Sequence, residues 1–210
     1  MHKSVYSVIL SDRLVNKLDE VAYKKGVSRS VMLDRILAEY LTEETTEMKM
    51  ANAFAEMERI IDRCAGLRFT NQASDYMAFV QSALSYKYNP TVKYSIELYP
   101  SGNLGQLKVS LRTGSETLLG IMQNFYELFI LIERKYIGER EYGFDGKRFI
   151  RILRRPERSL DKAGEYIAEY ISEFDDYLRI YFDNLGDEKK AALTIEKKYA
   201  ENTAKKEVIL

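Results

Sequence analysis

The sequence has a single cysteine and a single histidine, and these scarcities exclude several classes of function. Cys64 and His2 are the only residues of their kinds among 210. One cysteine rules out a disulfide framework within the chain and fits a reducing cytoplasm, which is where we expect the protein. One histidine argues against histidine acid–base catalysis and against metal sites built from clustered histidines and cysteines. We therefore expect no enzymatic activity, no metal and no cofactor.

The chain also lacks an excess of charge and a long hydrophobic run. It has 32 basic and 32 acidic residues, so no overall field attracts a polyanion. The most apolar stretch, residues 118–132, is interrupted by Gln123, Asn124 and Glu127, which predicts a buried helix with one wet face instead of a membrane span. The first residues alternate like a strand and do not resemble a secretory signal. We expect one or two globular domains and no membrane association.

Residues 1–42 contain the most informative pattern, a short alternating segment followed by two amphipathic helices. Residues 3–10 alternate with a period of two, which predicts a strand. Helical spacing follows in residues 11–26 and again in residues 28–41, and Gly26 can adopt the left-handed conformation that ends a helix. So small a segment cannot bury a core alone, and the pattern therefore predicts a dimer. The inward face of the expected strand is formed by Tyr6, Val8 and Leu10.

The run SVYSVILSDRLVNKLDEVAYKKGVSRSVMLDRILAEYL, residues 4–41, resembles the CopG-type ribbon-helix-helix family of DNA-binding proteins. The features that match are the strand, the Ser11-Asp12 helix start, Leu14 and Leu18, the Gly26-x-Ser28-Arg29-Ser30 turn, and the Ile36-Leu37 stripe. The resemblance implies that two chains pair their strands into an antiparallel ribbon, which enters the major groove of double-stranded DNA, and that their helices form a shared core.

The resemblance also implies which residues meet DNA. The base-facing residues are Lys3, Val5, Ser7 and Ile9, and the phosphate-binding residues at the start of the second helix are Ser28, Arg29 and Ser30. Family members usually have long polar or basic side chains at the base-facing positions, whereas Val5 and Ile9 are apolar and suit thymine methyl groups. The alternatives that stay open are a ribbon that serves dimerisation alone or pairs with another protein, and a Ser28 that only caps its helix.

Residues 43–210 predict a mainly helical domain with one β-hairpin. Helical spacing is found in residues 50–64, 71–87 and 115–137, whereas residues 91–112 alternate with a period of two around a turn. The expected fold class is thus α+β and mainly helical: an N-terminal ribbon-helix-helix over residues 1–42, followed by a helical domain that contains a hairpin at 91–112.

Two later stretches have alternative interpretations. Helically spaced tyrosines, Tyr166, Tyr170, Tyr177 and Tyr181, either line a ligand pocket or pack in a core, and packing is the more frequent use of such a stripe. The charged residues after Gly186 predict an exposed helix or a frayed end with little apolar surface to hold it.

A basic stretch near residue 150 predicts a second anion-binding face. At helical spacing it would group Lys147, Arg148, Arg151, Arg154, Arg155 and Arg158. This face would be a second DNA contact or an anion site, or else a solvated face paired with the acidic helix that follows, and solvation is the commoner outcome for such a run.

These patterns together favour a homodimeric or higher-order transcriptional regulator that binds double-stranded DNA. Residues 43–210 would then assemble dimers on DNA, respond to a small effector or bind a protein partner. The alternative is an interaction or assembly protein, such as a plasmid maintenance, mobilisation or antitoxin component, whose C-terminal domain recruits a protein partner.

Overall fold

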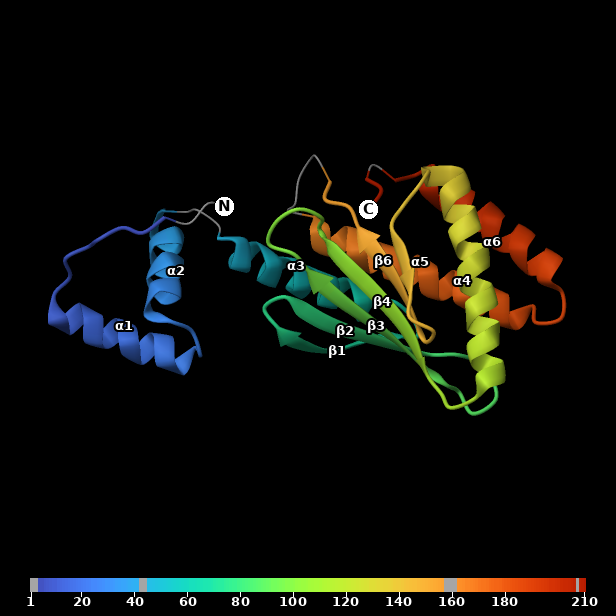
Figure 1. The fold of residues 1–210 in the computed structure, drawn as a ribbon, viewed down its shortest axis with the longest axis horizontal. Coiled ribbons are helices and arrows are strands. Elements are labelled where there is room, and N and C mark those ends of the chain that lie inside the picture. The colour runs from blue at the N-terminus through green and yellow to red at the C-terminus, as the bar shows by residue number, and fades with distance from the viewer. Residues whose placement is uncertain (1–3, 42–44, 157–161, 207) are drawn as a thin grey trace. The chain divides into compact units, whose positions relative to one another are not determined.

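The computed structural model describes residues 4–41, 45–156, 162–206 and 208–210, and the chain divides into two compact units (Figure 1). Unit 1 is Met1–Lys49 and unit 2 is Met50–Leu210. The sequence predicted the division at residue 42. Each unit has a hydrophobic core of its own, and the two cores differ greatly in size.

Unit 1 is built from two short helices. Helix α1, Asp12–Lys24, follows Ser11, and helix α2 is Arg29–Leu41. Between them Gly26 has a φ of 64°, which a glycine adopts without steric cost and which turns the chain into α2. The buried core is Leu18, Ala22 and Met32, with Val27 and Leu33 packed against it.

Unit 2 combines a six-stranded antiparallel sheet with four helices. In chain order the elements are α3 Thr46–Ile61, β1 Leu67–Ser74, β2 Met77–Ala83, β3 Thr91–Leu98, β4 Gly105–Arg112, α4 Glu116–Ile137, β5 Tyr142–Phe144, β6 Arg148–Leu153, α5 Ala163–Asp183 and α6 Glu188–Thr203. The strand order is β1-β2-β3-β4-β6-β5, with every neighbouring pair antiparallel. In Figure 1, α3 and α5 pass behind the strands.

The expected fold class is wrong. Residues 4–10 form no strand within the chain, and unit 2 has a large sheet where a helical domain with one hairpin was predicted. The predicted hairpin exists as β3 and β4, but it is the centre of the sheet. Residues 71–87, predicted to be a helix, contribute to β1 and β2 instead.

The error in β2 has a physical cause. Ala78, Val80 and Ser82 face inward, as alternation requires, but Met77 and Phe79 on the other face are also apolar and only partly exposed. Such a run has apolar residues at both helical and strand spacings. A short apolar run of this kind does not distinguish a strand from a helix.

One face of the sheet and the four helices form the core of unit 2. Phe174 of α5 lies near its centre and packs edge-on against Tyr94 of β3, 6.1 Å between ring centroids, and against Phe129 of α4 at 4.8 Å. Helices α3 and α5 approach closely at Gly164, where a Cβ atom would collide with the carbonyl oxygen of Ala53. These contacts fix all the layers to one another.

The sequence predicted an exposed or frayed end after Gly186, but helix α6 packs against the core of unit 2. Ala191, Ile195 and Tyr199 are spaced four apart, and all three are buried in the core of unit 2. One apolar residue in each turn is enough to dock a helix that is otherwise charged.

Candidate functional site

The residues predicted to face DNA bases lie on an extended and solvent-exposed segment. Lys3 lies outside the described residues. Val5, Ser7 and Ile9 are exposed, Val5 at 99% of its full surface, and Tyr6 of the predicted inward face is 83% exposed as well. Of residues 4–10, only Leu10 is half-buried, so both faces of this segment carry exposed apolar side chains.

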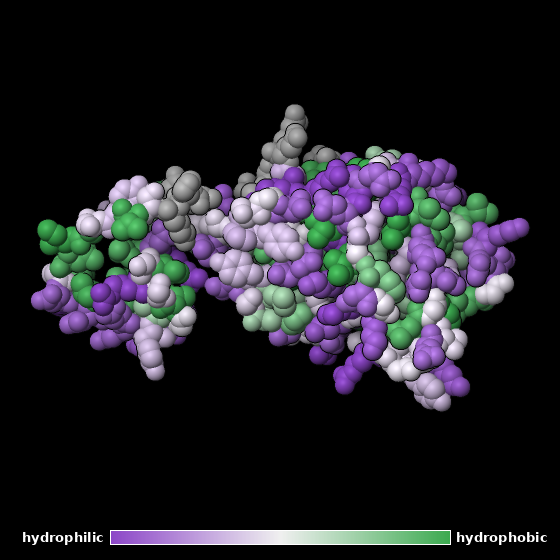
Figure 2. Space-filling model, in the orientation of Figure 1, coloured by the Kyte–Doolittle hydropathy of each residue, from purple (hydrophilic) through white to green (hydrophobic). Residues whose placement is uncertain are grey.

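Apolar side chains are also exposed on the two helices of unit 1, and Figure 2 shows hydrophobic patches on the surface of this unit. They include Leu14 on α1 and, on α2, Ile36, Leu37, Tyr40 and Leu41. Two helices with three buried core residues leave much of their apolar surface in water. Surface of this kind is characteristic of a unit completed by a partner.

The predicted phosphate-binding residues gather at the start of α2, as expected for residues 28–30. Ser28 Oγ accepts a hydrogen bond from the backbone N–H of Val31 at 3.3 Å, so Ser28 caps the helix. Ser30 is exposed. Because a helix N-terminus has backbone N–H groups without helical partners, it favours an anion.

Arg29 forms an ion pair with the carboxylate of Asp19 on α1. Its Nε and Nη2 donate to the two oxygens of Asp19, both at 2.6 Å. The hydrogen bond from Arg29 holds the pKa of Asp19 below its usual value of 3.8, and the same pair raises the pKa of Arg29. Both side chains are well exposed, so a phosphate can compete with Asp19 for the guanidinium.

The predicted second basic face does not form, because residues 148–153 are a strand and not a helix. Arg151 points inward and is buried, whereas its neighbours on the strand point to the other side. Arg155 donates to the carbonyl oxygens of Tyr99, Gly102 and Asn103. Lys147, Arg148 and Arg154 are exposed, and Arg158 lies outside the described residues. The structure thus separates the six side chains that helical spacing groups together.

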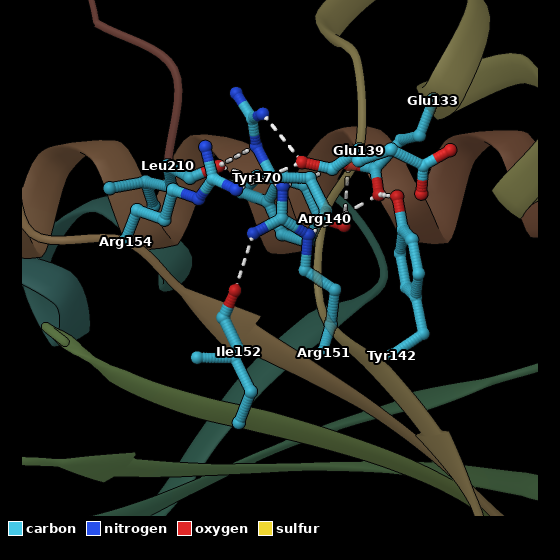
Figure 3. Close-up of polar contacts among 9 residues, drawn as sticks. All are labelled: Glu133, Glu139, Arg140, Tyr142, Arg151, Ile152, Arg154, Tyr170 and Leu210. Atoms are coloured by element: carbon cyan, nitrogen blue, oxygen red, sulfur yellow. Dashed lines mark hydrogen bonds and ion pairs between the residues drawn. The ribbon is translucent and has the colours of Figure 1, made fainter.

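Arg151 instead forms a buried ion pair with Glu133 of α4 (Figure 3). Both side chains have no exposed surface. Arg151 Nε and Nη2 donate to the two carboxylate oxygens at 3.2 and 3.3 Å, and Tyr142 and Tyr170 donate their hydroxyls to the same oxygens at 2.6 and 3.0 Å. The carboxylate therefore receives four hydrogen bonds, which offset much of its loss of hydration.

Each nitrogen of the Arg151 guanidinium has a hydrogen-bond partner. Nη1 donates to the carbonyl oxygen of Ile152 at 2.8 Å, and Nη2 donates to that of Leu210 at 2.7 Å. Arg140 Nε lies 3.4 Å from the same oxygen of Leu210. The cluster thereby links strand β6 to helices α4 and α5 and to the last described residues.

The environment keeps Arg151 and the two tyrosines of this cluster in one protonation state. Burial disfavours the charged form of Arg151, but its interactions with Tyr170 and Glu133 outweigh burial and raise its pKa. Burial, and then the carboxylate of Glu133, raise the pKa of Tyr170 and Tyr142, so both hydroxyls remain donors. Because every side chain of the cluster is paired, the cluster offers no free acid, base or nucleophile. Its role is structural: it holds β6 against α4 and α5.

The tyrosine stripe of α5 packs into this region. Tyr170, Tyr177 and Tyr181 are buried, and the cavity beside Tyr170, Tyr177 and Arg151 has a volume of about 20 Å³. This is room for one water molecule and not for an effector.

A second buried carboxylate, Asp175 of α5, is satisfied in the same way. It accepts hydrogen bonds from Ser82 Oγ, from Tyr94 OH at 2.7 Å and from Arg179 Nε at 2.8 Å. It connects β2 and β3 to the helical layer, just as Glu133 connects β6.

The sequence contains signals for both ends of the buried ion pair. Arg151 lies between Phe149 and Leu153 in an alternating strand, and Glu133 lies four residues after Phe129 on the apolar stripe of α4. A charge on each of two buried faces predicts a partnership, because a lone buried charge is too costly.

Within the described part of the chain, no group of three or more His, Cys, Asp or Glu side chains could hold a metal ion. A search of the same residues finds no helix with the length and hydrophobicity needed to cross a membrane. Comparison of the chain with models of protein families, with curated proteins and with solved structures finds no match.

Proposed function

We propose that the protein is a sequence-specific, DNA-binding transcriptional regulator that acts as a homodimer, with unit 1 as the part that binds the major groove. The observation that carries this proposal is the extended segment of residues 4–10, which exposes apolar side chains on both faces beside two helices with a core of three residues.

A second copy supplies what this segment lacks. Pairing the segments of two chains would satisfy backbone groups that have no strand partner and would cover the row of Tyr6, Val8 and Leu10. The opposite row, with Val5, Ser7 and Ile9, would face outward. A two-stranded ribbon fits the width of the major groove, where Val5 and Ile9 suit thymine methyl groups and Ser7 suits a base edge.

The start of α2 supplies the phosphate contact in this proposal. Ser28 and Arg29 combine free backbone N–H groups, the positive end of the helix dipole and a guanidinium that a phosphate can take from Asp19. Such contacts would orient the dimer on DNA, and the outward row would select the sequence.

Two substitutions of Ser28 separate its role as a cap from its role at a phosphate. Ser28→Asp keeps an oxygen acceptor for the N–H of Val31 and retains the stability of α2, but it places a negative charge where a phosphate is expected. Ser28→Ala removes the cap at a cost of about 1 kcal/mol and adds no charge. We expect Ser28→Asp to weaken DNA binding far more than Ser28→Ala does.

The measurement is selection of bound sequences from a random duplex library by the full-length chain, followed by titration of the selected DNA. Ser7→Ala should change the sequence preference, whereas Arg29→Ala should weaken binding to all sequences and lower its salt dependence. Equal binding by the wild type, Ser28→Asp and Arg29→Ala would contradict the proposal. Dimerisation without any DNA selection would favour the alternative, an assembly protein whose exposed segment pairs with another protein.

A further inference from the structure

The outward face of the sheet in unit 2 is strongly basic, although the whole chain has no net charge. The strand pairings place five basic side chains on this face, against the single carboxylate of Glu97. The five are Arg68 of β1, Lys93 of β3, Lys108 and Arg112 of β4, and Arg148 of β6.

The register aligns three of these residues in one row across five strands. The successive cross-strand partners in this row are Arg68, Gln81, Lys93, Ser110 and Arg148. Every member of the row is a cation or a hydrogen-bonding side chain, and none is acidic. Because neighbouring strands are about 4.8 Å apart, the row is roughly 19 Å long, with a cation at each end and one in the middle. We call it the basic row.

Few of these charges are neutralised. Among the described residues, Arg148 pairs with Asp145 and Lys108 lies 3.5 Å from Glu97, whereas Arg68 has no carboxylate within ion-pair distance. Lys93 lies over the ring of Phe79, 3.7 Å from its centroid, which holds the ammonium group in place without neutralising it.

The acidic residues of unit 2 are concentrated on the other side of the sheet. Helix α5 has six acidic residues and one basic residue, and it packs on the inward face through contacts such as Phe174 with Tyr94. Together the four helices carry 15 acidic and nine basic residues, so the side of the sheet that they cover is the more acidic one. A polyanion that approaches it is oriented toward the outward face of the sheet.

We propose that the outward face of this sheet binds the sugar-phosphate backbone of a nucleic acid, with Arg68, Lys93 and Arg148 as the principal phosphate contacts. The hydrogen bonds and ring contacts between the helices of unit 2 and its strands involve inward residues, such as Tyr94, Ser82, Phe149 and Arg151. Charge complementarity selects the occupant: each strand of a DNA duplex carries one phosphate for about every 3.4 Å of the helix axis, so several phosphates can lie along a row of this length.

This contact is independent of the function proposed for unit 1. It reads no bases, so it does not require the operator of a regulator, and a duplex or a single strand supplies the same phosphates. The ring of Phe79 on this face is half-buried and lies under the ammonium group of Lys93, so we expect little base stacking on it.

The test is titration of the full-length chain with duplex and single-stranded DNA of random sequence over a range of salt concentrations. The triple variant Arg68→Ala, Lys93→Ala, Arg148→Ala is compared with a control, Lys189→Ala, Lys190→Ala, Lys197→Ala, which removes three exposed charges from α6. We expect the slope of log affinity against log salt to fall by about 2 to 3 in the triple variant, since each lost phosphate contact removes about 0.9 for a duplex and about 0.7 for a single strand. The control should keep the slope of the wild type.

A charge-conserving variant distinguishes the loss of positive charge from the loss of the folded structure. Arg68→Lys, Arg148→Lys should bind with nearly the slope of the wild type, and circular dichroism would verify that all variants are folded. An unchanged slope in the folded triple variant overturns the proposal, and so does binding of the wild type to anionic lipid vesicles but to neither DNA probe. If unit 1 does not recognise a DNA sequence, the selection would yield no preferred sequence. The triple variant would still have a smaller salt slope than the wild type.

Discussion

The two units of this chain differ in how much of their apolar side-chain surface they bury. Unit 2 buries large aromatic side chains and even two carboxylates within its own layers, whereas unit 1 has a core cluster of three buried residues and leaves apolar side chains exposed on both helices and on residues 4–10. The difference teaches that the chain has one self-contained unit and one that is incomplete alone. In the two proposals above, unit 1 binds a partner through its uncovered apolar surface, and unit 2 binds one through charge.

The largest expected effect comes from breaking the buried ion pair that makes unit 2 self-contained. Arg151→Met should destabilise unit 2 by about 3–5 kcal/mol, because it leaves the carboxylate of Glu133 buried without its cation. The measurement is unfolding by denaturant, followed by circular dichroism and by tyrosine fluorescence.

A double variant identifies the cause of that loss. Glu133→Leu combined with Arg151→Met removes both charges and should recover a large part of the stability lost in the single variant, although Tyr142 and Tyr170 lose their acceptor. If the double variant were less stable than Arg151→Met, the unpaired charge would not be the source of the effect.

A prediction of intermediate size tests whether a second copy of the chain covers the exposed apolar surface of unit 1. Leu37 is 48% exposed in the single chain, where a polar substitution costs little, but a dimer core would bury it. We expect Leu37→Asp to weaken self-association roughly 30-fold, equivalent to about 2 kcal/mol, as measured by analytical ultracentrifugation.

The matched control is Asn16→Asp, which adds the same charge at an exposed position of α1 away from its apolar stripe. It should leave self-association unchanged. A monomeric wild type, or equal weakening by both variants, would show that the exposed apolar surface of unit 1 does not bind a second copy.

The smallest effect concerns the exposed pair of Asp19 and Arg29. Because the folded-state pKa of Asp19 lies below its usual value of 3.8, the pair adds stability above that pH and loses it as the pH falls through the lower, folded-state pKa. Asp19→Asn should abolish this acid-dependent component, which NMR titration and acid unfolding of unit 1 would detect.

The same substitution should strengthen DNA binding a few-fold at neutral pH, because it frees Arg29 for a phosphate and removes a nearby negative charge. Weaker binding by Asp19→Asn would mean that the carboxylate positions Arg29 for DNA and does not compete with it.

Most of the helices and the hairpin of β3 and β4 were the parts of the fold that could be predicted. Spacing places α1, α2 and α4 close to their observed bounds, because long amphipathic patterns with capping residues are locally determined. Strands β1, β2, β5 and β6 were missed, and β6 shows one reason. Arg148–Leu153 alternates, but its inward set contains Arg151, and a buried arginine is understood only once Glu133 is known to face it.

The candidate sites show the same difference between features that depend on local sequence and features that depend on distant residues. Ser28 and Arg29 could be placed from sequence because their position depends on one helix start, although the pairing of Arg29 with Asp19 could not. The basic row could not be found at all, because its residues come from five strands and are brought together only by register.

The strand order has a consequence for the folding rate of unit 2. Strands β1 to β4 are joined by short connections and pair with their sequence neighbours, whereas β4 reaches β6 only after the chain has passed through α4 and β5. Closing the longer loop costs more entropy, so we expect the β1–β4 meander to form early and β6 to dock late. Arg151 would then act mainly after the transition state: its loss should speed unfolding much more than it slows folding.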